Sequence, residues 1–153
     1  MRTKLIVAAV AALAVAALAA AQVPGKAPSK PRLNFTLTGK IKTVNFVDNA
    51  PEGSSVGDVV IFTQTLKDAR GRVVGSDHAT CTQSLPAGHK VCSGGFLLGR
   101  GQLTIQGIDP PESVTRHPLI VTGGSGAYRG VSGDIDVHHL SPVEDKFVFR
   151  LKR

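Results

Sequence analysis

One carboxylate in the sequence stands where acid–base chemistry could take place. Asp77, Ala79 and Cys81 alternate within a strand-like run, so their side chains are expected on one face. If Cys81 lies directly opposite Cys92, the same register places Asp77 opposite Phe96. A carboxyl group buried among aromatic rings has a raised pKa and can act as a general acid or base. The alternative is a β-bulge that turns Asp77 to water.

The neighbours of this carboxylate would form an apolar cavity. When the strand-like runs on either side of Gly99-Arg100 are paired as a hairpin, one of the two faces is more apolar than the other. The strand-like run before Asp77 also has one more apolar face. A bulge in the turn at 68–71 would shift the pairing of Phe62 in the run before Asp77. We predict Asp77 as the catalytic residue, oriented by Gln64, and the following ligand-binding residues: Phe62, Gln64, Phe96, Leu103 and Ile105.

A second set of ligand-type side chains alternates along a run nearer the C-terminus. Asp134, Asp136 and His138 point one way, and an isoleucine and a valine point the other. Two carboxylates and an imidazole could ligate a metal ion. The pattern is also typical of a solvated face over a buried apolar face, which we favour. We therefore predict no metal ligands.

The chain contains two cysteines, Cys81 and Cys92. A cysteine pair in an exported chain is typical of a disulfide, which contributes about 2–4 kcal/mol to stability. The alternative is a catalytic thiol pair, but the spacing is not Cys-x-x-Cys and no basic cluster flanks either residue. We predict the disulfide.

The N-terminal segment has the pattern of an export signal. Arg2 and Lys4 precede an apolar run, and Ala19-Ala20-Ala21 fits a cleavage site. We predict a signal peptide over 1–21, a flexible tether over 22–32 and a single domain over 33–153. A retained membrane anchor is the alternative for the first segment, and no later segment is apolar enough for a transmembrane helix. The expected location is extracellular or in the cell envelope.

The charge of the chain argues against nucleic-acid binding. The net charge is +7, but the basic residues are scattered, and the chain has six Phe, one Tyr and no Trp. Nucleic-acid surfaces cluster Lys and Arg, often with stacking aromatic residues. We interpret the positive net charge instead as a loose attraction to the anionic polymers of a cell envelope.

The elements that must position these residues are short strands. No long segment has a helical period, and glycine and proline punctuate the chain. We predict strands over 33–46, 57–67, 72–83, 91–98, 101–109, 117–123, 128–139 and 144–152. Short connections, including a type II′ turn at Gly99-Arg100, indicate an antiparallel up-and-down meander that closes into an eight-stranded β-barrel. A Greek-key sandwich is the alternative.

Three segments together resemble the dirigent and allene oxide cyclase-like barrels, especially exported bacterial members. They are VGDVVIFT at 56–63, GRVVGSDH at 71–78 running on to Cys81-Thr82, and VTGGSGAYRGVSG at 121–133. The last is similar to the group's Gly-Gly-Thr-Gly-x-Phe/Tyr-x-x-Ala-x-Gly signature, with Ser125 in place of Thr and Val131-Ser132 in place of the usual pair. The likeness runs from about residue 33 to 153.

The resemblance implies an eight-stranded antiparallel barrel, often trimeric, that needs no cofactor and holds a reactive molecule in one shape. The substrate-binding motifs of the plant cyclases are not matched, so no residue roles transfer. We expect a small apolar ligand, guided in cyclisation or stereochemistry as by a cofactor-free isomerase. The alternative is a non-enzymatic secreted binding or envelope-associated module with a packed barrel.

Overall fold

The computed structural model describes residues 33–84, 88–111 and 113–153. The predicted signal peptide and tether lie outside the described residues. The described residues form eight β-strands and one short 3₁₀ turn, η1, and contain no helix that could cross a membrane. The elements are β1 (Asn34–Val47), β2 (Val59–Lys67), β3 (Val73–Gln83), β4 (Lys90–Leu98), β5 (Gly101–Asp109), β6 (Arg116–Gly124), η1 (Gly126–Tyr128), β7 (Ser132–Ser141) and β8 (Glu144–Lys152).

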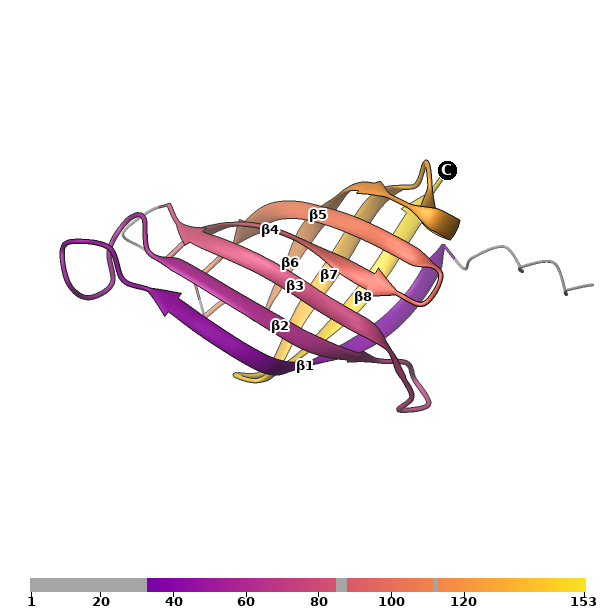
Figure 1. Cartoon of the computed structure of the whole chain (residues 1–153), viewed down its shortest axis with the longest axis horizontal. Helices are drawn as coiled ribbons and strands as arrows, with labels where there is room; N and C mark the ends of the chain where they lie inside the picture. Colours follow the sequence, from indigo (N-terminus) through magenta and orange to yellow (C-terminus); the bar gives the residue numbers. More distant parts are fainter. Residues whose placement is uncertain (1–32, 85–87, 112) are drawn as a thin grey trace, which may run out of the picture.

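The strands form a closed antiparallel barrel in sequence order, as predicted, and not a Greek-key sandwich (Figure 1). The long strand β1 closes it, because residues 34–40 pair with β8 and residues 38–47 pair with β2. The register of β1 against β2 shifts between Ile41 and Thr43. Such a shift bends a strand, which helps one strand serve two neighbours in a curved sheet.

The register around the disulfide is as predicted. Cys81 pairs with Cys92 across β3 and β4, and their sulfur atoms are bonded. Asp77 accordingly pairs with Phe96 on one side and with Gln64 of β2 on the other. The register shift between β2 and β3 lies beyond these pairs, at Leu66 and Lys67. No bulge therefore displaces Asp77 from the inward face.

Apolar side chains fill the half of the barrel that holds η1. Phe96 and Leu103 are fully buried, whereas Leu97 on the opposite face is half exposed. Phe96 packs edge-on against Phe147 and Phe149, with ring centroids 5.1 and 5.0 Å apart. The predicted inward face is thus confirmed. The cluster comprises Leu37, Leu66, Phe96, Leu98, Leu103, Ile105, Leu119, Val121, Tyr128, Val131, Ile135, Val137, Phe147, Phe149 and Leu151.

Two local predictions were wrong. The β4–β5 hairpin turns at Gly99-Arg100, but Gly99 lacks the positive φ that a type II′ turn requires. The positive φ in this hairpin is instead that of Gly101, at 146°. A Cβ on Gly101 would lie 2.2 Å from the carbonyl oxygen of Ser125, so this glycine also lets the η1 segment pack closely. The strand expected from 128 begins only at Ser132, because η1 occupies the preceding residues.

Candidate active site

Asp77 is buried in the barrel interior on β3. Its exposed fraction is 2% and that of Gln64 beside it is 1%. Among the described residues, no hydrogen-bond partner reaches the Oδ1 atom of Asp77. Burial raises the pKa of Asp77 to about 7, the charge of Asp145 adds to this rise, and a hydrogen bond from the backbone of His78 opposes it. The carboxyl group is therefore able to gain or lose a proton near neutral pH.

Gln64, which pairs with Asp77 across β2 and β3, reaches β8. Its Nε2 atom donates a hydrogen bond to Oδ2 of Asp145 at 2.5 Å. Gly39 of β1, which pairs with Asp145, makes room for this amide, because a Cβ there would lie 2.3 Å from Oε1 of Gln64. The amide thus lies between two carboxyl groups, Asp77 and Asp145, and is held by the second.

Asp145 continues the polar network to β7. Its Oδ1 atom lies 2.6 Å from Nδ1 of His139. The Nε2 atom of His139 lies 3.7 Å from Oδ1 of Asp109, at the end of β5. The carboxylates of Asp109 and Asp145 together raise the pKa of His139 to about 9. At neutral pH the imidazole therefore balances one of the two acidic charges.

Asp109 gathers further side chains from β4 and β6. Its Oδ1 atom lies 3.6 Å from Nε2 of His117, and its Oδ2 atom lies 3.6 Å from Nζ of Lys90. Lys90 and the histidines together keep the pKa of Asp109 below its usual value, although burial alone would raise it. Burial lowers the pKa of His117. The network thus runs from Gln64, the cross-strand neighbour of Asp77, to the end of the barrel opposite η1.

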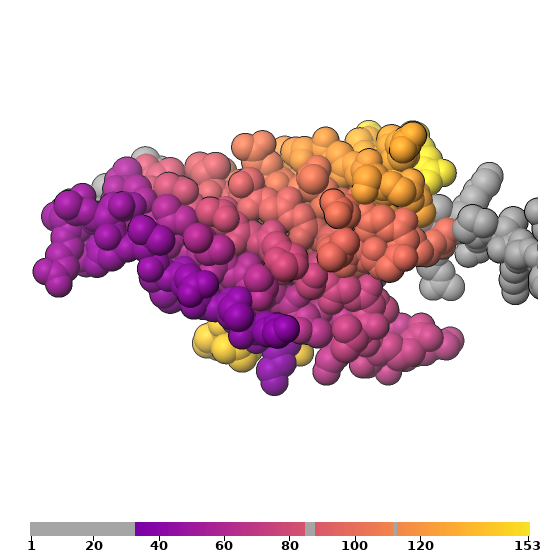
Figure 2. All heavy atoms as spheres, in the orientation of Figure 1, coloured from indigo at the N-terminus to yellow at the C-terminus, as the bar shows by residue number. Residues whose placement is uncertain are grey.

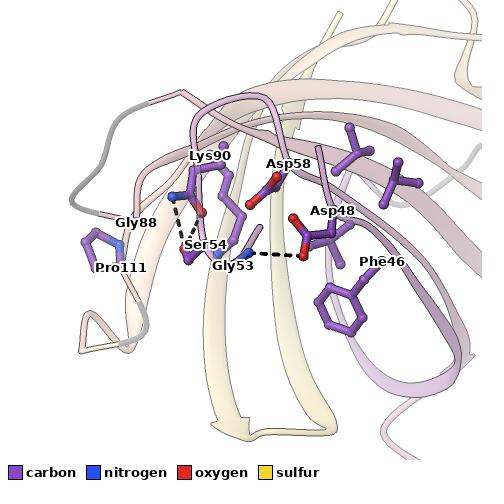
Figure 3. A pocket seen from close by; sticks show the side chains of 12 residues that line it. Phe46, Asp48, Gly53, Ser54, Asp58, Gly88, Lys90 and Pro111 are labelled. Atoms are coloured by element: carbon purple, nitrogen blue, oxygen red, sulfur yellow. Dashed lines mark hydrogen bonds between the residues drawn. The ribbon is translucent and has the colours of Figure 1, made fainter. Parts of the chain in front are cut away.

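A hollow of about 560 Å³ opens at this end, beside the segment that joins β1 and β2. That segment projects beyond the strands (Figures 1 and 2). Asp58 helps to hold it by accepting hydrogen bonds from the backbone amides of Asn49 and Ser55. Figure 3 shows Lys90 and Asp58 among the side chains around the hollow, which is also lined by Phe46, Val47, Asp48, Gly53, Ser54, Val59, Val60, Gln83, Gly88 and Pro111.

The apolar residues predicted to bind a ligand lie deeper than this hollow. Phe62 is half-buried on the inward face of β2, between Val60 at the hollow and Gln64. Phe96, Leu103 and Ile105 belong to the packed cluster and line neither this hollow nor one of about 440 Å³ at the opposite end. That second hollow is lined by Phe35, Leu37, Val73, Val74, Leu98, Gly99, Arg100 and Tyr128.

The alternating residues Asp134, Asp136 and His138 lie on the outer face of β7, where the two carboxylates form ion pairs. Both carboxylate oxygens of Asp136 accept hydrogen bonds from Arg116, and Oδ2 also accepts one from Arg150. These arginines hold the pKa of Asp136 well below its usual value. Asp134 is exposed, and Ile135 and Val137 are buried on the other face. The buried apolar face is thus as predicted, but the other face is solvated only in part, because Asp136 is buried beneath the arginines.

The sequence interpretation missed Asp109, His117, Asp145 and the role of His139. All four lie at strand ends, where they continue the inward alternation of Ile105, Leu119, Phe147 and Val137. That alternation is the sequence signal for these residues, and it continues past the apolar part of each strand into the polar end.

No protein-family model and no curated protein matches the sequence. Solved structures do match the fold. Pyocyanin demethylase superposes with a TM-score of 0.70 and 24% identity, over 78% of this chain and 99% of the other. A pterocarpan synthase dirigent protein gives a TM-score of 0.60 and 17% identity, over 78% and 89%. AbnU, an exo-specific intermolecular Diels-Alderase, gives 0.59 and 15%, over 75% and 90%. At these identities the likeness shows a shared barrel fold.

Proposed function

We propose that this chain, which has the eight-stranded barrel fold of dirigent proteins and Diels-Alderases, binds a small apolar molecule and guides its cyclisation or isomerisation. Asp77 acts as the general acid or base. The observation that carries this proposal is a carboxyl group inside the barrel with a pKa of about 7 and one oxygen that no hydrogen-bond partner reaches among the described residues. Catalytic acids and bases work best with a pKa near the operating pH.

The layout of β2 supports a route from solvent to Asp77. Val60, Phe62 and Gln64 share the inward face, and Val60 lines the hollow. Four residues of strand span about 13 Å, so a molecule of moderate size that enters at Val60 and displaces Phe62 reaches the carboxyl group. Phe62 and the rings beyond Asp77 would hold an apolar skeleton, and Gln64 would orient the reacting group.

The first experiment asks what the protein retains. The purified protein is incubated with a lipid and metabolite extract and examined by native mass spectrometry. We expect one retained apolar molecule, which then serves as the substrate for assays of Asp77→Asn.

For Asp77→Asn we expect binding to persist and the rate to fall by about 10²–10⁴-fold, because proton transfer in the transition state is lost. The pH–rate profile of the wild type should show an inflection near pH 7 that the variant lacks. Asp134→Asn, which changes an exposed carboxylate on the outer face, serves as the control. A full rate in Asp77→Asn would exclude this role for Asp77.

A specific observation favours the alternative of a non-enzymatic secreted binding or envelope module. Phe96 and Leu103 are fully buried in a cluster that fills much of the barrel. A packed interior of this kind would leave the exposed surface to make contacts. Protein that retains no molecule from the extract, and whose Phe62→Ala variant also retains none, would favour this alternative.

A further inference from the structure

Three metal-ligand side chains converge at the end of the polar network nearest to solvent. Asp109, His117 and His139 each offer one ligand atom, and these atoms all lie within 4.8 Å of one another. They come from β5, β6 and β7, so the closed sheet itself brings them together. Both imidazoles direct Nε2 at the same atom, Oδ1 of Asp109.

The spacing of these atoms suits an ion between them. The two Nε2–Oδ1 distances are 3.6 and 3.7 Å, which exceed the range of about 2.7–3.2 Å for an N–H···O hydrogen bond. In a tetrahedral zinc site with bonds of about 2.0–2.2 Å, neighbouring ligand atoms lie about 3.4 Å apart. The two Nε2–Oδ1 distances are within a few tenths of an ångström of this value, and the two Nε2 atoms lie within 4.8 Å of each other.

The surroundings of His139 and Asp109 orient these two side chains as ligands are oriented in known metal sites. Nδ1 of His139 lies 2.6 Å from Oδ1 of Asp145, an arrangement that leaves Nε2 to face the ion once the ion has displaced its proton. Nε2 of His117 is directed at Oδ1 of Asp109, and its Nδ1 is buried without a hydrogen-bond partner among the described residues. Lys90 lies against the other oxygen of Asp109 and leaves Oδ1 as the ligand atom.

We propose that Asp109, His117 and His139 bind one divalent transition-metal ion of the zinc type. Two imidazole nitrogens select such an ion over Mg²⁺ or Ca²⁺, which prefer all-oxygen sites. Three protein ligands leave a fourth position for water or a donor atom of a bound molecule, the pattern of catalytic zinc sites. The side chains of His139 and Asp109 are 35% and 22% exposed, so an ion can reach them. The proposed site departs from the sequence-based expectation of no metal ligands and does not depend on the role of Asp77.

The test begins with the wild-type protein. After treatment with EDTA and dialysis into metal-free buffer, the protein is titrated with Co²⁺ and then with Zn²⁺. We expect one equivalent of Co²⁺ per chain, with the intense visible absorption of a four-coordinate site, and its displacement by Zn²⁺. A spectrum that remains that of aqueous Co²⁺ would overturn the proposal without the use of any variant.

Adjacent residues on opposite faces of β7 provide a matched pair of variants. His139→Ala should lower the Zn²⁺ affinity at least 100-fold in calorimetry, whereas His138→Ala should leave it unchanged. Asp145→Asn should retain the stoichiometry and lower the affinity about 10–100-fold, as removal of an outer-shell carboxylate does. Equal affinities for wild type and His139→Ala, with circular dichroism showing both folded, would overturn the proposal.

The metal site and the proposed activity are separable. Asp77→Asn should bind Zn²⁺ as tightly as the wild type, because Asp77 is not one of the three ligands and no hydrogen bond to them is found for it among the described residues. If Asp77→Asn lowered the Zn²⁺ affinity as much as His139→Ala does, the metal would be bound elsewhere in the barrel.

Discussion

At the scale of single residues, the interior of this barrel is unusual because it buries an incompletely paired carboxyl group. Gln64 could satisfy a neutral Asp77, but its Nε2 atom donates to Asp145. Oδ1 of Asp77 and Oε1 of Gln64 are both without a hydrogen-bond partner among the described residues. A buried polar atom without a partner costs about 1–3 kcal/mol, so this site reduces the stability of the fold. Such a cost is typical of functional sites.

The stability cost gives a prediction for Asp77→Asn. The pKa of Asp77 is about 7 in the folded protein. In the unfolded chain it takes the ordinary value for aspartate, 3.8. As pH rises between these values, the unfolded chain loses this proton first, so the wild type loses stability. Asparagine has no proton to lose. Relative to the wild type, the variant should therefore gain stability from about pH 4 to about pH 7 and show no further gain above that.

Urea denaturation at about pH 4, 5.5, 7 and 8 measures this difference in free energy of unfolding. Asp134→Asn should show no such trend, because Asp134 is exposed on the outer face. A difference between Asp77→Asn and wild type that is the same at every pH would contradict the assigned pKa.

At the scale of elements, the β3–β4 hairpin fixes the position of Asp77. The Cys81–Cys92 disulfide joins directly opposed residues, four positions along β3 from Asp77. Side chains alternate along both strands, so this one covalent link specifies which residues of the pair face inward. Gly94 then makes room for the close approach of the strands, because a Cβ there would lie 2.3 Å from the carbonyl oxygen of His78.

The double variant Cys81→Ala/Cys92→Ala tests the contribution of this link. We expect the free energy of unfolding to fall by about 2–4 kcal/mol, because the unfolded chain regains the freedom that the closed loop removes. Chemical denaturation under non-reducing conditions measures the change. Thr80→Ala/Ser93→Ala, an exposed neighbouring pair on the outer face, should change stability much less. An equal loss in both variants would show that the covalent link itself contributes little.

At the scale of the whole molecule, closure of the barrel leaves no edge strand. Residues 34–40 of β1 pair with β8, so the first and last described strands lie side by side (Figure 1). We call this pairing of β1 with β8 the seam. Phe35 stacks on Phe149 across it, with ring centroids 4.3 Å apart. Closure also creates two different ends, one beside η1 and one beside the polar network.

Hydrogen exchange tests whether the seam is as stable as the rest of the barrel. Paired amides of β1 and β8 in the Phe35–Phe149 region should be protected as strongly as those of β4 and β5, because in a closed barrel they open only with global unfolding. Exchange measured by nuclear magnetic resonance or mass spectrometry gives this comparison. Seam amides that exchange orders of magnitude faster would indicate a barrel that opens between β1 and β8.

The sequence determined the local features of this protein. Alternation of apolar residues and glycine-rich turns predicted the eight strands and their antiparallel order, because short connections can join only neighbouring strands. The cysteine pair predicted the register that places Asp77 inside. The exact turn at Gly99-Arg100 could not be predicted, because its backbone conformation depends on contact with the η1 segment.

Only the tertiary structure decided which polar residues meet. Asp109, His117, His139 and Asp145 belong to four strands, and alternation along each strand shows that a side chain points inward but not at what depth or toward which partner. That depends on the stagger and closure of all eight strands, which set how far each strand end reaches across the barrel. The carboxylate predicted from one hairpin thus lies, through closure, beside the inner end of a network that reaches solvent.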